Sequence, residues 1–192
     1  VDQIGRSNFT IPYFDGSLSI SRASRTFPQF LIFKPAMIIT GILLIFYWNI
    51  NNELINNFYK TKRNYKFKLF GILSAIFLIL HSILLGVSFD ISIFKLLRRV
   101  VLLGFIIFEI IAQCILVYNF FKLKKVIDKF FNKNILKLKI LLVSLLSSVA
   151  ILSLPLLIVR GNIHFKHGLE WNYFLGVIMF YLLTNFFWKK TT

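Results

Sequence analysis

The sequence predicts an all-α fold, a polytopic bundle of transmembrane helices. Hydrophobic residues make up 57% of the 192 residues, and the mean hydropathy is +0.75. Soluble domains are only about half apolar. The net charge of +16 is concentrated in basic clusters that alternate with long apolar runs. In a soluble chain such a charge would suggest nucleic-acid binding, but apolar runs of this length predict membrane spans. We therefore expect no nucleic-acid partner.

Five segments are long and apolar enough to cross a hydrocarbon core of about 30 Å, which takes about 20 helical residues. They are residues 30–50, 69–89, 100–120, 140–159 and 171–188. No internal repeat and no Gly/Ser-rich linker separates them, so we predict one five-helix transmembrane domain over residues 30–192. Residues 1–29 mix Gly, Ser, Asp, Arg and Pro, which predicts an irregular segment that faces outside or into a lumen.

The distribution of Lys and Arg predicts the orientation of these spans. Fourteen of the 23 basic residues lie in two long connections and at the C-terminal end, namely Lys60, Lys62, Arg63, Lys66, Lys68, Lys122, Lys124, Lys125, Lys129, Lys133, Lys137, Lys139, Lys189 and Lys190. By the positive-inside rule, this side is cytoplasmic. Basic residues at the opposite ends of the spans are interpreted as interfacial anchors whose stems snorkel to the headgroups: Lys34, Lys95, Arg98 and Arg99.

Three polar residues fall at a similar depth inside the predicted spans. Glu109 lies at the middle of the third span, His81 slightly outward of the middle of the second, and Gln113 one turn from Glu109 on the same face. We hypothesise that they form an intramembrane network. It either handles a proton or a headgroup, or it joins helices by hydrogen bonds and contributes stability alone.

Motifs for catalysis or cofactor binding are mostly absent from the sequence. There is no Gly-rich phosphate loop, no nucleophile elbow and no dinucleotide fingerprint, and we expect no cofactor. The single cysteine, Cys114, excludes a disulfide framework. In HFKHGLE, His164, His167 and Glu170 have a spacing that could bring metal ligands together, although interfacial polar residues account for the same pattern. The 23 phenylalanines are interpreted as lipid-facing bulk.

Two local patterns resemble the DRAM/FRAG/Sfk family, which comprises damage-regulated autophagy modulators and a lipid-remodelling factor for glycosylphosphatidylinositol anchors. In ISRASRTFPQF, Ile20 and Ser21 precede Pro28 and Phe30 at the entry to a span, as in the family's luminal stretch. In GLEWNYFLGVIMFYLLTNFFW, a Glu-Trp pair enters an aromatic-rich last span. Two positions differ from the family pattern, because Arg22 replaces an acidic residue and Ser24 a glycine.

The resemblance implies a six-span fold, of which the five predicted spans would be the second to sixth. The resemblance places a further helix before the luminal stretch, and the start at Val1 rather than Met fits the loss of either a signal peptide or an earlier helix. The resemblance also implies a role in lipid handling, anchor maturation or autophagy. It draws attention to a candidate site on the outward face made of Ser21, Arg22, Arg25, Glu170 and Trp171.

The leading interpretation is a non-catalytic integral membrane protein with a lipid-related or membrane-organising role and with membrane lipids as partners. A second interpretation is an accessory subunit of a larger membrane complex, whose partners would be other membrane protein subunits. A third is a lipid-modifying enzyme or a proton-coupled carrier that uses His81 and Glu109, and it requires a water-accessible cavity that reaches both residues.

Overall fold

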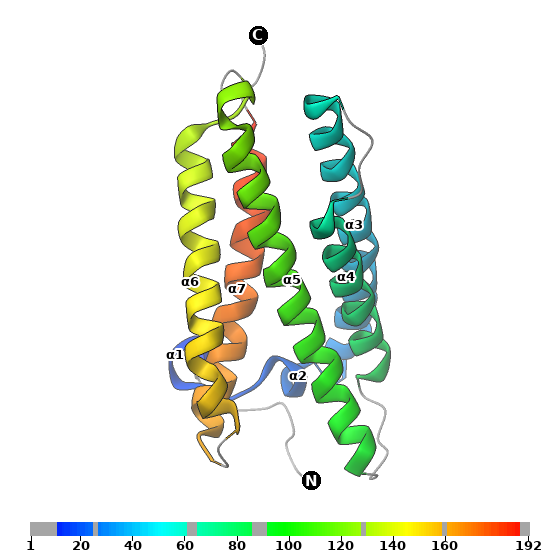
Figure 1. Ribbon diagram of the computed structural model, residues 1–192. Coiled ribbons are helices and arrows are strands. Elements are labelled where there is room, and N and C mark those ends of the chain that lie inside the picture. The colour runs from blue at the N-terminus through cyan, green and yellow to red at the C-terminus, as the bar shows by residue number, and fades with distance from the viewer. Residues whose placement is uncertain are drawn as a thin grey trace.

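The computed structural model describes residues 11–24, 27–60, 65–85, 92–127, 130–158 and 161–188, and most of these are helical. Five long helices lie side by side (Figure 1): α3 (Gln29–Tyr59), α4 (Lys66–Leu84), α5 (Ser92–Ile127), α6 (Lys133–Ile158) and α7 (Ile163–Phe187). Two single-turn helices, α1 (Pro12–Asp15) and α2 (Ile20–Ala23), lie at the end of the bundle where α3 begins. The predicted all-α class is confirmed, and the described ranges contain no named strand.

Four of the helices are long and apolar enough to cross a membrane. They are α3, α4, residues Leu96–Leu123 of α5 and residues Lys133–Ser153 of α6. Large apolar side chains such as Ile32, Leu43 and Leu152 are exposed along them. Extensive exposed apolar surface is typical of a protein that faces lipid or a partner rather than water. Four apolar helices therefore indicate a multi-pass membrane protein, and α7, expected as the fifth span, is not among the four.

The helices extend further than the predicted spans. The long basic connection after the third span is largely helical, since α5 continues to Ile127 and α6 starts at Lys133. Lys137 and Lys139 are consequently helical.

Residues 1–29 are also not wholly irregular, since α1 and α2 form there, while residues 1–10, 25 and 26 lie outside the described residues. Local side-chain bonds explain α2, because the Ser19 hydroxyl caps its first turn by accepting from the Arg22 backbone N–H.

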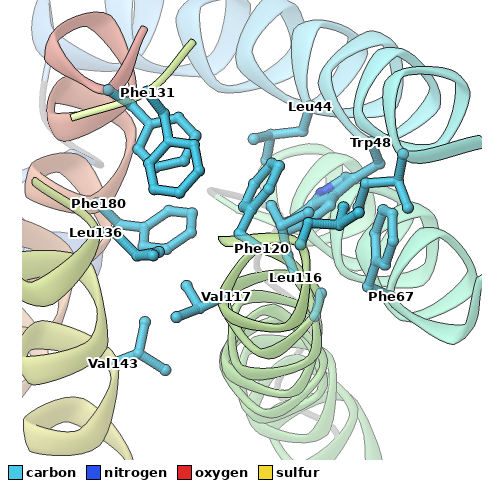
Figure 2. Packing of buried hydrophobic residues seen from close by; sticks show 14 of the residues in the cluster. Leu44, Trp48, Phe67, Leu116, Val117, Phe120, Phe131, Leu136, Val143 and Phe180 are labelled. Atoms are coloured by element: carbon cyan, nitrogen blue, oxygen red, sulfur yellow. The ribbon is translucent and has the colours of Figure 1, made fainter. Parts of the chain in front are cut away.

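Helix α5 lies at the centre of the buried core. Figure 2 shows Leu116, Val117 and Phe120 of α5 between Trp48 and Phe67 on one side and Phe131 and Phe180 on the other. Five phenylalanines are buried among the described residues, so the interpretation of all phenylalanines as lipid-facing bulk was wrong: Phe67, Phe120, Phe131, Phe180 and Phe187. Large rings fill the space between helices because they contribute the most contact area per side chain.

A close approach of α3 and α4 depends on glycine. A Cβ at Gly71 of α4 would lie 2.2 Å from the ring of Trp48, which is fully buried. Only a residue without a Cβ lets the indole pack directly on the α4 backbone. Just before α4, the Tyr65 backbone N–H donates to Asn52 Oδ1 of α3 at 3.0 Å. This bond satisfies a backbone donor that the start of a helix leaves free. α3 and α4 therefore form a well-packed pair against α5.

The segment from Ile11 to Ser24 is fastened to the start of α7. Trp171 Nε1 donates to the Leu18 carbonyl at 2.7 Å, Asn172 Nδ2 donates to the Tyr13 carbonyl at 3.0 Å, and His167 Nδ1 lies 3.0 Å from the Gly16 carbonyl oxygen. Gly16 has a positive φ of 59° and approaches the His164 backbone so closely that no Cβ would fit. This docking places α2 beside α7 and close to the ends of α4 and α5 (Figure 1).

Candidate functional site

Glu109 is fully buried at the centre of the bundle and has three hydrogen-bond partners. The Ser74 hydroxyl of α4 and the Tyr181 hydroxyl of α7 both donate to its carboxylate, and Gln113 Nε2 donates to it at 2.9 Å. Gln113 was expected in this network, whereas Ser74 was not. Three helices are joined at one carboxylate, which is how polar side chains hold helices together inside a membrane. We name Glu109, Ser74, Gln113 and Tyr181 the central network.

Lys139 of α6 is the second buried ionisable group in this region. Its exposed fraction is 1%, and its ammonium donates to Thr184 Oγ1 at 2.6 Å. The same ammonium lies 4.3 Å from the ring centre of Phe180 and 5.4 Å from that of Phe187, so two aromatic faces stabilise the cation. Thr184 Oγ1 is also 3.5 Å from the Tyr47 hydroxyl.

Tyr47 connects Lys139 to the central network through ring contact. The ring centres of Tyr47 and Tyr181 are 4.9 Å apart in an edge-to-face arrangement. Hydroxyl groups of α3 and α7 thus lie between the buried acid of α5 and the buried amine of α6. Both ionisable groups are enclosed in side chains, so the geometry favours a structural role inside the bundle.

His81 lies in another part of the molecule. It is on the same face of α4 as Ser74 but seven residues further along, which is about 10 Å along the helix axis. The hydrogen-bond partners of Glu109 come from Ser74, Gln113 and Tyr181, and the His81 side chain instead lines two cavities near the end of the bundle that carries α1 and α2.

The first of these cavities, named here the basic pocket, has a volume of about 360 Å³. It lies between α2, α4, α5 and α7, and its lining consists of Ser19, Ser21, Arg22, His81, Leu85, Arg98, Arg99, Leu102 and His167. All three arginines in the described part of the chain line this one pocket, and the described lining contains no carboxylate. An excess of guanidinium groups in a cavity is the arrangement that recognises phosphate or carboxylate groups.

Two side chains of the basic pocket show its electrostatic character. Arg98 Nε is buried and has no hydrogen-bond partner among the residues that the structure describes. His167 precedes the span predicted over residues 171–188. Burial lowers the pKa of His167 below its ordinary value, and the nearby Arg22 and His164 lower it further, against the opposing effect of its bond to the Gly16 carbonyl. A buried donor without an acceptor and a histidine with a depressed pKa both indicate a site that a bound anion would stabilise.

A small apolar cavity of about 60 Å³ adjoins the basic pocket, and His81 and Leu102 line both. Its other lining residues come from α2, α3, α4, α5 and α7: Ile20, Phe33, Met37, Leu78, Phe105, Ile106, Glu170, Tyr173, Phe174 and Val177. The shared residues place a polar compartment directly beside a hydrophobic one. This is the arrangement required by a ligand with a charged head and an apolar tail.

The residues predicted for the outward face have separate positions in the structure. Ser21 and Arg22 line the basic pocket, Glu170 lines the apolar cavity, and Trp171 fastens the N-terminal segment. Arg25 lies outside the described residues. Among the residues that are described, no three His, Cys, Asp or Glu side chains could hold a metal ion, so His164, His167 and Glu170 do not form a metal site.

Sequence reasoning missed the roles of Lys139, Arg98 and Arg99. Lys139 was assigned to a cytoplasmic connection, although it shares a helix face with the buried residues Leu136, Val143 and Leu146 at spacings of three, four and seven. That periodicity was the available signal. Arg98 and Arg99 were interpreted as interfacial anchors, and no sequence signal showed that α2 and α7 would enclose them.

Comparison of the chain with family models, curated proteins and solved structures finds no match.

Proposed function

We propose that this chain is a five-span integral membrane protein that binds anionic lipid through the basic pocket, in a non-catalytic, lipid-related role. The observation that carries the proposal is the position of the basic pocket beside the apolar cavity, with His81 and Leu102 in the wall of both. The guanidinium groups of Arg22, Arg98 and Arg99 would hold a headgroup, and the apolar cavity would receive the start of an acyl chain.

The fifth span in this proposal is α7. Its 25 residues give a length of about 37 Å, so it can cross a hydrocarbon core of about 30 Å while its start, which holds His167, lies outside that core. Tyr181, in its second half, donates to Glu109 of α5, so α7 runs at the same depth as a helix apolar enough to span. Its polar side chains lower its hydropathy, but Tyr173 and Tyr181 have hydrogen-bond partners inside the bundle.

We further propose that the basic pocket faces outside or a lumen and that the connections rich in lysine face the cytoplasm. Positive-inside counting supports this orientation. Membership of the DRAM/FRAG/Sfk family is part of the same proposal, and it rests on the Ile20-Ser21 and Glu170-Trp171 patterns. Replacing Lys62 or His164 by cysteine and labelling intact cells with a membrane-impermeant maleimide tests the orientation. Labelling at position 164 but not at 62 is expected, and the reverse pattern would contradict it.

Lipid binding is tested with the purified chain in detergent by native mass spectrometry after addition of phosphatidylglycerol or phosphatidylcholine. The wild-type protein is expected to retain phosphatidylglycerol preferentially. Arg98→Gln combined with Arg99→Gln is expected to lose that preference. Lys34→Gln is the matched control, because Lys34 is a cation at the same end of the bundle that does not line the basic pocket. Equal retention of both lipids by the wild type would exclude the proposed function.

A further inference from the structure

The charge of the basic pocket indicates which kind of anionic headgroup fits it best. Arg22, Arg98 and Arg99 each bring a guanidinium cation to the pocket. Glu170 is the one carboxylate lining the adjoining apolar cavity among the described residues. Among the described residues that line the two cavities, three guanidinium cations therefore stand against one carboxylate. A phosphodiester headgroup brings one negative charge to this site, whereas a terminal phosphate brings nearly two.

The basic pocket also offers hydrogen-bond donors that suit a group with several acceptor oxygens. Each guanidinium presents donors in a planar fork that matches two phosphate oxygens. Arg98 Nε is buried without an acceptor in the described part of the chain, and the hydroxyls of Ser19 and Ser21, which are 3.3 Å apart and hydrogen-bond to each other, lie in the same lining. A phosphodiester has two unesterified oxygens, while a terminal phosphate presents three strong acceptors.

The shape of the site places an apolar group next to that phosphate. The basic pocket measures about 360 Å³, and it shares His81 and Leu102 with a cavity whose other walls are mostly Phe, Leu, Ile, Met and Val. We propose that the ligand is a phosphomonoester lipid, whose terminal phosphate occupies the basic pocket and whose chain enters the apolar cavity. This inference rests on the proposed function and narrows it to one class of headgroup.

The experiment compares lipids with equal acyl chains but different headgroups. The purified full-length chain is titrated in detergent at pH 8, where a phosphomonoester carries close to two charges, and lipid retention is measured by native mass spectrometry. Phosphatidic acid is expected to bind about tenfold more tightly than phosphatidylglycerol, since one additional charge-assisted hydrogen bond has about that effect. Phosphatidylcholine is expected to bind weakest.

The two failures are distinguishable. Equal affinity for phosphatidic acid and phosphatidylglycerol, with both above phosphatidylcholine, would overturn the phosphomonoester inference and leave the proposed function standing. Equal affinity for all three would overturn both. Inorganic phosphate and glycerol 3-phosphate are added as competitors to separate a lipid from a soluble phosphate. Displacement of phosphatidic acid by either at comparable concentration would show that the apolar chain contributes nothing, and would overturn the lipid assignment.

Variants locate the binding. Arg22→Gln and Arg98→Gln are each expected to weaken phosphatidic acid binding about tenfold or more, and to reduce its advantage over phosphatidylglycerol. Arg22 is exposed on a short helix, so its replacement tests the inference even if Arg98→Gln fails to fold. Lys34→Gln is expected to bind phosphatidic acid as the wild type does. An unchanged affinity in Arg22→Gln and Arg98→Gln would place the lipid elsewhere and overturn the inference.

Discussion

The central network and the basic pocket are two polar regions of the same bundle, and they differ in whether their polar groups are enclosed by side chains or line a cavity. In the central network, Glu109 is fully buried and accepts hydrogen bonds from three side chains. In the basic pocket, cations line a cavity of about 360 Å³, and Arg98 Nε has no acceptor among the described residues. In the central network the carboxylate is enclosed by its donors, and the unpartnered Gln113 Oε1 is buried with it, whereas in the basic pocket the unpartnered Arg98 Nε belongs to a residue that lines a cavity.

Whether a polar group is enclosed or lines a cavity distinguishes a structural role from a binding role here better than its residue type does. An acid and a lysine in a membrane span are functional candidates by default. Here both are enclosed, with Thr184, Tyr47 and Tyr181 between them, and the central network therefore joins helices. The arginines near the helix ends, which are ordinary anchors by sequence, line a cavity that is rich in cations. The enzyme or carrier interpretation required a water-accessible cavity that reaches both His81 and Glu109. His81 lines the basic pocket and the apolar cavity, but Glu109 lines neither.

The largest effect is expected from Glu109→Ala. The change removes one acceptor and leaves the donors of Ser74, Gln113 and Tyr181 buried without a partner, so the free energy of unfolding should fall by about 4 kcal/mol. Denaturation in mixed micelles measures it. Glu109→Gln keeps a carbonyl acceptor and should cost less than half as much. Glu53→Ala, at an exposed position of α3, is the control and should change little. A destabilisation of Glu109→Ala no larger than that of Glu53→Ala would show that the central network does not hold the helices together.

Lys139→Ala should have the next largest effect. It empties the space of a buried side chain and removes a cation from the faces of Phe180 and Phe187, with an expected loss of about 2–3 kcal/mol. Lys139→Met restores the volume without the charge and separates the two contributions. Lys137→Ala, two residues away and exposed, should stay within about 0.5 kcal/mol of wild type. Similar losses at positions 137 and 139 would contradict the burial of Lys139.

Tyr181→Phe should cost about 1–2 kcal/mol, because it removes a single hydroxyl from the central network and preserves the ring. The measurement is again the free energy of unfolding. Tyr59→Phe, which removes the hydroxyl of an exposed tyrosine at the end of α3, is the matched control and should be neutral. In lipid binding, Tyr181→Phe should match the wild type, and a loss of binding without a loss of stability would move function from the basic pocket to the central network.

Much of the architecture could be predicted from the sequence because it depends on local patterns. Apolar runs predict helices and their approximate positions, and the spacing of Glu109 and Gln113 predicts that they share a helix face. The basic pocket could not be predicted in this way. It exists because Trp171, Asn172 and His167 of α7 hold residues 11–24 in place, and those contacts join residues more than 150 positions apart. The face that Lys139 occupies was predictable from periodicity, but its positive charge favoured assignment to a loop.

The smallest effect is expected from protonation of His167. The affinity of the basic pocket for an anion should depend on pH, whereas the central network binds no ligand in our proposal. The pKa of His167 lies below its ordinary value of 6.5, so the imidazole is mostly neutral at pH 7.5 in the free protein. A depressed pKa means that the unfolded chain takes up the proton first, so this group lowers stability as the pH falls below 6.5. Bound anion has the opposite effect, because it attracts the proton to His167 against the repulsion of Arg22 and His164.

Affinity for an anion should therefore rise by a few-fold as the pH falls from 7.5 to 5, since an anion that raises the pKa of His167 by about one gains at most about tenfold in affinity. Phosphatidylglycerol is the appropriate probe because its phosphodiester keeps a single charge over this range, whereas a phosphomonoester would itself take up a proton near pH 6. His167→Gln retains an amide that can donate to the Gly16 carbonyl but cannot titrate, and it should bind phosphatidylglycerol with the same affinity at both pH values. A pH dependence that persists in His167→Gln would assign the proton to another group, with His81 as the remaining imidazole of the basic pocket.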